Sequence, residues 1–428
     1  MSQEKKVLIY GKGKVGTALK NFCEYNKIPS DIRDDSDNIE SFDKYSIIIP
    51  SPGINPSHRI YTTGKIVGEL DFISPYLPKG FKIISITGTD GKSTTAWIAY
   101  NLLKQEYGEE KVFLSGNFEI PFAETVQTIQ EKGLKGGCIV LEVSSFMSYN
   151  IGSFKSTHSI FTNFETDHLN WHPNIQDYFD AKMRLFEHTT GVSIINEQVF
   201  SRAKEFGLRL PTNIPNVRIF GTDKNLKDRT DGENIILSGR KKYLLNETRF
   251  SGMHNAMNIL SCTLVINTLK ICSKRTREYL KNISGLSHRL ELVTTKNGVA
   301  FVDDSKSTSA QSLIAALGSF ADKKVILIAG GSDKGDTFEH LGPILGQKVK
   351  HAALIGATRE ILGKICERHG VSYYYSESMN EAVLLSAKTA KAGDIVLLSP
   401  GCASFGMFKD YLDRAEKFRE SVENLDFS

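Results

Sequence analysis

The segment 87–95, Thr-Gly-Thr-Asp-Gly-Lys-Ser-Thr-Thr, contains the residue types that bind nucleoside triphosphates. It follows an apolar run that predicts a strand and precedes an expected helix at about 96–104. Backbone N–H groups at a helix start bind phosphate oxygens, a lysine reaches the β- and γ-phosphates, and a hydroxyl group binds Mg²⁺. Lys92 and Ser93 supply the last two groups. We therefore predict nucleotide binding by a variant loop, which has Ile86 where the general pattern has glycine.

Carboxylate and imidazole groups follow two later apolar runs. Glu142 ends one run, and Asp167 and His168 come shortly after the next. Because the carboxyl ends of parallel strands meet at one edge of a sheet, Glu142 could reach a metal ion held by Ser93. Taken alone, the pattern favours a surface carboxylate for Glu142 and a polar core residue for His168.

A second glycine pattern opens the chain. Gly11, Gly13 and Gly16 lie between an apolar run and a predicted helix, and Asp34 and Asp35 follow about 20 residues later, as in dinucleotide-binding folds. This pattern leaves three interpretations open, namely NAD(P) binding, binding of another nucleotide diphosphate, or a structural turn.

Two polar loops in the last third of the chain also follow apolar runs. They are 303–308, Asp-Asp-Ser-Lys-Ser-Thr, and 330–335, Gly-Gly-Ser-Asp-Lys-Gly. Hydroxyl groups, a lysine and exposed backbone at strand ends suit an anionic substrate. Hydrophilic turns are the alternative.

The elements that position these loops predict an α/β protein of three domains. A chain of 428 residues exceeds the ~250 to 300 residues that one hydrophobic core serves. Apolar runs alternate with helix-length stretches, which indicates open, mostly parallel sheets. We assign 1–80 to an N-terminal Rossmann-like domain, 81–285 to a central P-loop ATPase-like domain and 286–428 to a C-terminal Rossmann-like domain. The polar stretch 221–250 is expected to form turns before a helix at 255–269.

Composition excludes several classes of protein. The 53 basic and 49 acidic residues nearly balance, and no basic run is interleaved with aromatics, which argues against nucleic acid as a partner. No stretch approaches the ~18 apolar residues of a membrane span, and the first residues lack a signal-peptide core, so we expect a cytoplasmic protein that does not bind membranes. The six cysteines lie far apart, which favours reduced thiols over disulfides or zinc.

Taken in order along nearly the whole chain, these motifs resemble one family, the Mur ligases. The matching segments are GKGKVG, SPGI, ITGTDGKST, GN at 116–117, LEVSSF, NFETDHLNWH, AKMRLF, GMHNAMN, LSHRLE, DDSKST, GGSDKG and LSPGCASF. Those of the last third are most similar to the members that add D-glutamate. The resemblance implies a monomeric, ATP-dependent and Mg²⁺-dependent ligase that joins D-glutamate to UDP-N-acetylmuramoyl-L-alanine through an acyl phosphate, in peptidoglycan precursor synthesis.

The resemblance also implies a role for each matching residue. Residues for ATP are Gly88, Thr89, Asp90, Gly91, Lys92, Ser93, Thr94, Asn255, Asn258, Arg289 and Asp304. Residues for the UDP-linked substrate are Gly11, Gly13, Lys14, Val15, Gly16, Asp34, Ser51, Pro52, Gly53, Asn117 and Ser144. Residues for glutamate are Lys306, Thr308, Lys334, Ser404 and Tyr411. One Mg²⁺ ion is expected on Ser93 and Glu142, and a second on His168 and a carbamylated Lys182; Lys92, His168 and Lys182 are the expected catalytic residues.

The chain departs from the family pattern at three of these motifs. Tyr411 replaces a common Phe, Ser309 a more usual Asn, and Met147 a commoner Gln. Alternative interpretations are a relative that adds another amino acid such as L-glutamate, and a ligase like folylpolyglutamate synthetase. An NAD(P)-dependent oxidoreductase would leave the phosphate loop and Glu142 unexplained. A non-catalytic nucleotide-binding regulator would be expected to lack Lys92, Glu142 or Lys182, and all three are present.

Overall fold

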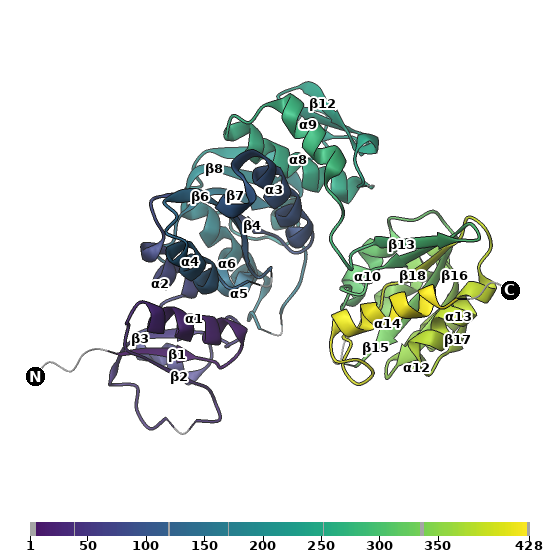
Figure 1. Ribbon diagram of the computed structural model, residues 1–428, viewed down its shortest axis with the longest axis horizontal. Coiled ribbons are helices and arrows are strands. Elements are labelled where there is room, and N and C mark those ends of the chain that lie inside the picture. Colours follow the sequence, from purple (N-terminus) through teal and green to yellow (C-terminus); the bar gives the residue numbers. More distant parts are fainter. Residues whose placement is uncertain are drawn as a thin grey trace, which may run out of the picture. The chain divides into compact units, whose positions relative to one another are not determined.

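The computed structural model describes residues 6–425, except 38, 119, 170, 251 and 334–337 and the side chains of Lys241 and Gln311. The chain divides into two compact units, Met1–Ile283 and Ser284–Ser428 (Figure 1). Each is built from parallel strands and helices, as the sequence predicted.

Two parallel sheets form most of the first unit. The N-terminal sheet has the order β2-β1-β3, with β1 at Lys6–Tyr10, β2 at Ser30–Arg33 and β3 at Tyr45–Pro50. The larger sheet has the order β5-β6-β4-β7-β8-β9 and is parallel throughout. Its strands are β4 (Gly80–Thr87), β5 (Val112–Gly116), β6 (Gly136–Glu142), β7 (Ser156–Phe161), β8 (Thr189–Asn196) and β9 (Val217–Phe220). The apolar runs that predicted β4, β6, β7 and β8 are buried on both faces, as parallel sheets require.

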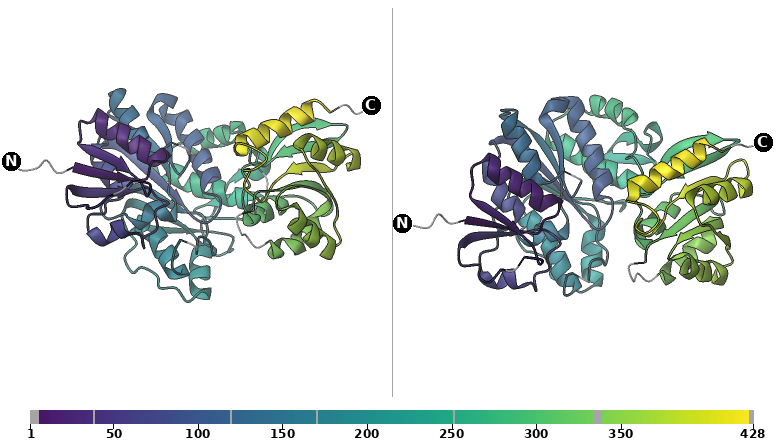
Figure 2. Two further views of the ribbon diagram at one scale, coloured as in Figure 1. Left: turned by 90° about the horizontal axis from the view of Figure 1, so that it is seen from below. Right: turned by 60° about the horizontal axis from the view of Figure 1, so that its bottom comes forward.

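Helices cover both faces of the larger sheet (Figures 1 and 2). Alternate strand residues divide into two cores, because successive side chains of a strand point to opposite faces. One core includes α1 (Lys14–Tyr25), α2 (Glu69–Ile73), α4 (Phe122–Glu131), α5 (Ser145–Tyr149), α6 (Ile175–Glu187) and α7 (Glu197–Glu205). The other includes α3 (Lys92–Tyr107), α8 (Met253–Thr268) and α9 (Ser273–Asn282). The N-terminal sheet and α1 pack into the first core with α4, so that the two sheets share one apolar interior.

The polar stretch 221–250 differs from the expected turns. It contains a small antiparallel sheet of β10 (Arg229–Thr230), β11 (Asn234–Leu237) and β12 (Arg240–Leu244). Ile235 and Leu237 are buried in the core that contains α8. These strands are too short, and too mixed with polar residues, for periodicity to reveal them.

The second unit has one sheet of order β13-β14-β18-β15-β16-β17, in which β13 alone is antiparallel to its neighbour. The strands are β13 (Glu291–Lys296), β14 (Val299–Asp303), β15 (Val325–Gly331), β16 (Val349–Gly356), β17 (Ser372–Tyr375) and β18 (Ile395–Leu398). The helices α10 (Ala310–Leu317), α11 (Gly342–Lys348) and α12 (Arg359–Arg368) pack on one face, and α13 (Met379–Thr389) and α14 (Tyr411–Glu423) on the other. The sequence predicted β14, β15, β16 and β18 but missed the exposed edge strands β13 and β17.

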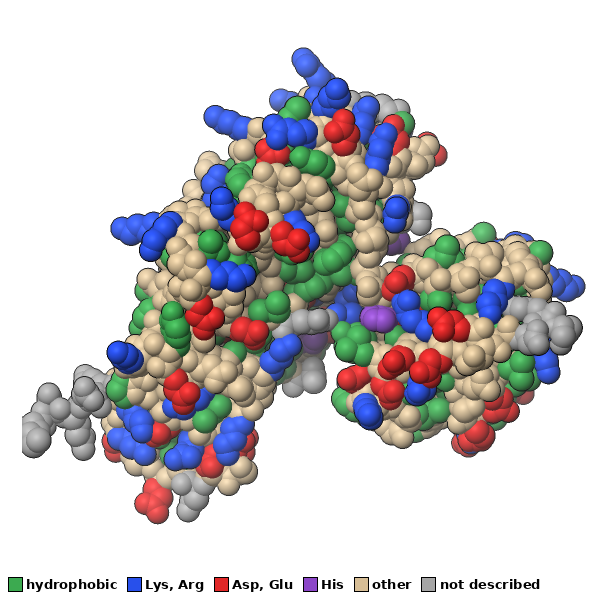
Figure 3. Space-filling view, viewed as in Figure 1, with side chains coloured by type: hydrophobic (Ala, Val, Ile, Leu, Met, Phe, Trp, Pro, Cys, Tyr) green, Lys and Arg blue, Asp and Glu red, His purple; other side chains and the backbone are tan. Residues whose placement is uncertain are grey.

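Surface chemistry follows the balanced composition. Basic and acidic side chains are interspersed on the face shown in Figure 3. All six cysteines are free thiols, and only Cys272 is exposed. Among the described residues, none of the helices combines the length and the apolar character needed to cross a bilayer.

Candidate functional site

The predicted phosphate loop joins β4 to α3 at the carboxyl edge of the larger sheet. Gly88 has a φ of +150°, and a Cβ there would lie 1.9 Å from Oγ1 of Thr162, so no other residue fits without a shift. Lys92 starts α3, and its Nζ donates to the carbonyl oxygens of Gly88 at 3.0 Å and Thr89 at 2.6 Å. The lysine cation is therefore held over the loop, where a phosphate oxygen can replace these carbonyls.

The end of β7 fixes the shape of this loop. Asp90 N–H donates to Oδ1 of Asn163 at 2.8 Å, and Oγ1 of Thr162 donates to the carbonyl of Asp90 at 2.6 Å. The backbone of Thr89 also bonds to that of Asn163. We did not predict Asn163 as a site residue, although it opens the motif that contains Asp167 and His168.

Glu142 ends β6 beside the strand that leads into the loop, since Val143 N–H bonds to the carbonyl of Ile86. Its side chain is 1% exposed, and Oε1 accepts a hydrogen bond from Nδ2 of Asn117 at 2.8 Å. Oε2 is buried and has no hydrogen-bond partner among the residues that the structure describes. A buried carboxylate oxygen is stable only with a cation or a proton, so this group fits a divalent metal ion.

Lys182 approaches the same loop from α6, whose first turn is capped by Asn174. The lysine is 1% exposed, and its Nζ donates to the carbonyl of Gly88 at 2.7 Å and lies 4.7 Å from the ring centre of Tyr178. Burial, with the nearby Lys92 cation, lowers the pKa of Lys182 well below the ordinary value. A neutral amine at neutral pH can act as a nucleophile toward CO₂.

His168 lies in the loop after β7, with a φ of +54° that places it in the left-handed region. Its Nε2 is 3.3 Å from Oδ2 of Asp167, and its ring centre is 4.7 Å from that of Phe146. Partial burial lowers the pKa of His168, and Lys182 and Lys92 act in the same direction. The imidazole is therefore neutral near pH 7, which is the form that binds metals.

The two asparagines of α8 lie behind the phosphate loop. Asn258 is 8% exposed, and its Oδ1 accepts from Oγ1 of Thr95 at 3.1 Å. A Cβ on Gly91 would lie 2.8 Å from the same oxygen. Asn255, one turn earlier, lies 3.5 Å from Nδ2 of Asn258. Asn258 therefore braces the start of α3, and Asn255 is the more accessible of the two.

The N-terminal glycine loop joins β1 to α1. A Cβ on Gly16 would lie 1.8 Å from the carbonyl oxygen of Gly11, so the helix approaches the strand as closely as glycine permits. Gly13 is the N-cap of α1, and Lys14 and Val15 open that helix. Asp34, just after β2, is held 3.4 Å from Nζ of Lys12.

The loop after β3 brings Ser51, Pro52 and Gly53 to the same edge, where Oγ of Ser51 donates to the carbonyl of Gly11 at 3.5 Å. Trp171 Nε1 donates to the carbonyl of Gly53 at 3.2 Å. The loop carrying His168 is thus tied to the N-terminal sheet. Ser144 is the N-cap of α5, and its Oγ accepts from the N–H of Met147.

The second unit gathers predicted residues around the loops after β14 and β18. Asp304 is buried, accepts from Oγ of Ser399 at 2.7 Å, and has its pKa raised by burial to about 7. Lys306 Nζ lies 5.1 Å from the ring centre of Tyr411. Arg289 lies on the adjoining segment before β13, Thr308 is exposed, Ser404 is buried, and Lys334 lies outside the described residues.

Arg414, on α14, joins these two loops and was not predicted. It is fully buried and donates to the carbonyl of Ser305 at 2.7 Å, to Oγ of Ser305 at 3.1 Å and to the carbonyl of Cys402 at 3.0 Å. An arginine in an otherwise polar helix pattern carries no sequence signal for such a role.

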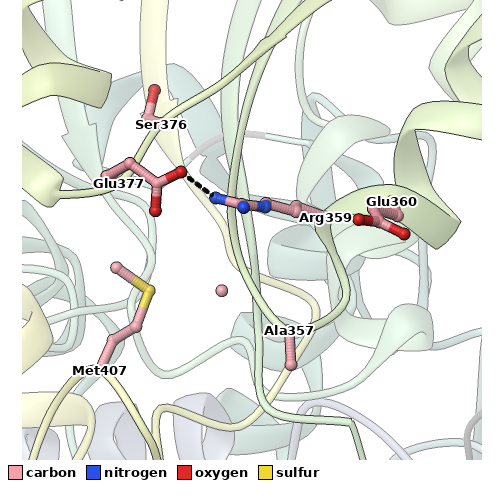
Figure 4. A pocket seen from close by; sticks show the side chains of 7 residues that line it. Ala357, Arg359, Glu360, Ser376, Glu377 and Met407 are labelled. Carbon is pink, nitrogen blue, oxygen red and sulfur yellow. Dashed lines mark hydrogen bonds and ion pairs between the residues drawn. The ribbon is translucent and has the colours of Figure 1, made fainter.

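Two other features of the second unit do not contain predicted residues. A cavity of about 390 Å³ after β16 and β17 is crossed by an ion pair of 2.6 Å between Arg359 and Glu377 (Figure 4). His288, Glu291 and Asp303 bring ligand-type atoms within 4.8 Å of one another. Arg419 contacts both carboxylates of that cluster, at 2.6 and 2.9 Å, so each carboxylate already has a cationic partner without a metal ion.

Comparison with known proteins identifies relatives over the whole chain. Residues 86–266 match the Mur ligase middle domain, and residues 288–402 match the Mur ligase glutamate ligase domain. The UDP-N-acetylmuramoylalanine–D-glutamate ligase of Aquifex aeolicus is 36% identical over 98% of both chains. The enzyme of the same name from Caldicellulosiruptor bescii is 34% identical over 90% of this chain and 85% of its own.

Solved structures show the same fold. The UDP-N-acetylmuramate–alanine ligase of Thermotoga maritima superposes with a TM-score of 0.62 at 15% identity, over 98% of this chain and 99% of that chain. The MurF ligase of the same organism, in complex with ADP, gives a TM-score of 0.59 at 18% identity, over 98% and 96%.

Proposed function

We propose, because this chain belongs to the Mur ligase family, that it joins D-glutamate to the alanyl carboxylate of UDP-N-acetylmuramoyl-L-alanine while ATP is converted to ADP and phosphate. The names of full-length relatives support this choice of substrates. The observation that carries the chemistry is the buried Oε2 of Glu142, which has no hydrogen-bond partner among the described residues, beside a lysine-bearing phosphate loop.

ATP binding is assigned to the loop from Gly88 to Thr94, with Asn255 near the nucleoside. Arg289 and Asp304 are also assigned to ATP, because their motifs resemble those of the family. Lys92 would leave the carbonyls of Gly88 and Thr89 and bind phosphate oxygens. The backbone N–H groups at the start of α3 and its positive dipole stabilise the charge that develops on the transferred phosphoryl group.

The donor set suits Mg²⁺, which prefers oxygen ligands and the phosphates of a bound nucleotide. Ser93 and Glu142 would hold one ion, and His168 and Lys182 a second. Bound Mg²⁺ supplies charge neutralisation at the phosphoryl oxygens. The lowered pKa of Lys182 favours its neutral amine, which would first attack CO₂, forming an N–C bond and releasing a proton, and so become an anionic oxygen ligand.

The N-terminal glycine loop, with Ser51, Pro52 and Gly53, is assigned to the UDP group, and Asn117 and Ser144 to the muramoyl-alanine end. Lys306, Thr308, Lys334, Ser404 and Tyr411 are assigned to glutamate. We also propose three domains, at 1–80, 81–285 and 286–428, that act as a monomer in the cytoplasm.

The reaction needs two steps, because a carboxylate does not react directly with an amine at neutral pH. The alanyl carboxylate first attacks the γ-phosphorus of ATP, which forms an acyl phosphate and releases ADP. The amine of glutamate then attacks the carbonyl carbon, loses a proton and expels phosphate as the amide forms. Lys92 and the loop N–H groups orient and stabilise the phosphoryl group, so no protein nucleophile is required.

The test is phosphate release from ATP with purified protein and Mg²⁺, over a panel of UDP-muramoyl acceptors and of D- and L-amino acids. We expect release only with UDP-N-acetylmuramoyl-L-alanine and D-glutamate together, coupled to one new amide. If turnover with L-glutamate equals turnover with D-glutamate, the protein is a member of the family with a different amino-acid specificity. Two outcomes would refute ligase function. One is phosphate release that needs no acceptor, and the other is the absence of phosphate release with every pair of acceptor and amino acid.

A further inference from the structure

A hydrogen-bonded relay of Ser145, His172 and Asp177, of which only Asp177 is partly exposed, lies outside the residues assigned above. His172 Nδ1 is 2.7 Å from Oδ2 of Asp177, and its Nε2 is 3.0 Å from Oγ of Ser145. His172 is fully buried, and Ser145 is 1% exposed. The carboxylate of Asp177 accepts from Nδ1–H, so Nε2 is left to accept the hydrogen bond of the Ser145 hydroxyl.

The relay joins three segments that contain or adjoin proposed metal ligands. Ser145 is the first residue of α5 and follows Glu142 by three positions. Asp177 lies in the first turn of α6, five residues before Lys182.

The third element is the loop after β7, and the relay is also connected to it through the backbone. The N–H of His172 bonds to the carbonyl of His168 at 2.9 Å. Phe146 stacks on the His172 ring at 5.8 Å and 13°, and Tyr178 packs against it at 5.2 Å. The imidazole is therefore held in one orientation by packing as well as by its two hydrogen bonds.

Serine, histidine and aspartate in this order also form the acyl-transfer machinery of hydrolases. That chemistry needs a hydroxyl group that a substrate can reach, and the burial of Ser145 and His172 prevents this. The three residues therefore act on the site through the elements they connect.

We propose that the Ser145–His172–Asp177 relay is a positioning device that holds Glu142, His168 and Lys182 at the spacing that binds the metal ions. The proposal rests on the metal sites given under the proposed function. Groups that orient metal ligands without touching the ion typically change metal affinity by about 10-fold to 100-fold when removed.

The test measures Mn²⁺ binding by its electron paramagnetic resonance signal, with the full-length protein and ADP, and so does not depend on turnover. Ser145→Ala and His172→Asn each break one relay bond and are expected to weaken Mn²⁺ binding about 10-fold. The double variant should lose little more Mn²⁺ affinity than either single variant, because both substitutions break the same relay. Ser148→Ala is the matched control, since Ser148 is equally buried in α5 and its hydroxyl group donates to the carbonyl of Ser144 instead of to the relay.

Asp177→Asn separates positioning from proton transfer. An amide donates to Nδ1 and so reverses the direction of both hydrogen bonds while keeping them. A positioning relay should then bind Mn²⁺ within about twofold of the wild type, whereas a proton-transferring set loses activity by about 10⁴-fold when its tautomer is wrong. The melting temperature of each variant is measured as well, so that a general loss of stability can be told apart from a specific loss of Mn²⁺ binding.

Unchanged Mn²⁺ affinity in Ser145→Ala would overturn the relay, and so would an equal loss in Ser148→Ala. A turnover loss of about 10⁴-fold in Asp177→Asn would overturn positioning in favour of proton transfer. If the wild type itself binds no Mn²⁺ with ADP, the proposed metal sites fail and the relay fails with them. Normal Mn²⁺ binding without ligation would refute the proposed function and leave the relay intact.

Discussion

Glu69 should make the first unit less stable as pH rises, and Glu69→Gln should remove this dependence. The side chain is 6% exposed at the start of α2. Its Oε1 accepts from the N–H of Ala123 at 3.1 Å, and its Oε2 is buried without a partner among the described residues. Burial raises the pKa of Glu69 from 4.5 to about 7.

The sign follows from the higher pKa in the folded state. The folded protein holds this proton more tightly than the unfolded chain, so Glu69 contributes stability below pH 4.5 that is lost as pH rises through 7. The complete loss is about 3 kcal/mol, from 1.36 kcal/mol for each unit of pKa shift. Between pH 5.5 and pH 8 it is about 2 kcal/mol.

The assay is urea unfolding followed by tryptophan fluorescence. Both tryptophans, Trp97 and Trp171, belong to the first unit, so this signal reports on the unit that contains Glu69. Between pH 5.5 and pH 8, the free energy of unfolding of Glu69→Gln should rise by about 2 kcal/mol relative to that of the wild type. Glu124→Gln, an exposed position on α4, is the control and should follow the wild type. Parallel pH profiles for Glu69→Gln and the wild type would refute the reasoning.

Three further predictions concern the site. Lys182→Ala should lower kcat by about 100-fold or more and regain part of it with added short carboxylates; wild-type-like turnover without them would exclude the role of Lys182 as a metal ligand. Glu142→Gln removes a buried carboxylate oxygen for which the described part of the chain offers no partner, so it should raise the Mg²⁺ concentration for half-maximal phosphate release at least about 10-fold. It should also raise the melting temperature in the absence of metal, and a lower melting temperature would contradict this account. Arg414→Leu should destabilise the second unit by about 3 kcal/mol, because it removes three buried hydrogen bonds, as measured by circular dichroism; the tryptophan transition serves as the internal control and should not move.

The phosphate loop shows why part of the site was readable from sequence. Its strand, glycines, Lys92 and Ser93 are neighbours along the chain, and a strand followed by a helix start orients them locally. The sequence also predicted that Glu142 lies at a strand end, because a buried parallel strand is a run of apolar residues that ends at a clear position.

Contacts between distant segments could not be read in this way. Lys182 reaches Gly88 across 94 positions, and Asn163 holds Asp90 across 73. Neither contact produces a periodic pattern in the sequence, because each depends on which strands are neighbours in the sheet. Arg414 is similar, because its burial depends on how α14 packs over two loops that are far apart in sequence.

The sequence by itself therefore determined the α/β class, the phosphate-binding loop and the family, because these depend on residue types at short spacing. Only the tertiary structure decided that Oε2 of Glu142 has no described partner, that Lys182 is buried with its pKa lowered, and that Ser145, His172 and Asp177 form a relay. The physical reason is that burial and hydrogen-bond partners are properties of the packed fold, and the pKa of a side chain changes only when its surroundings are assembled.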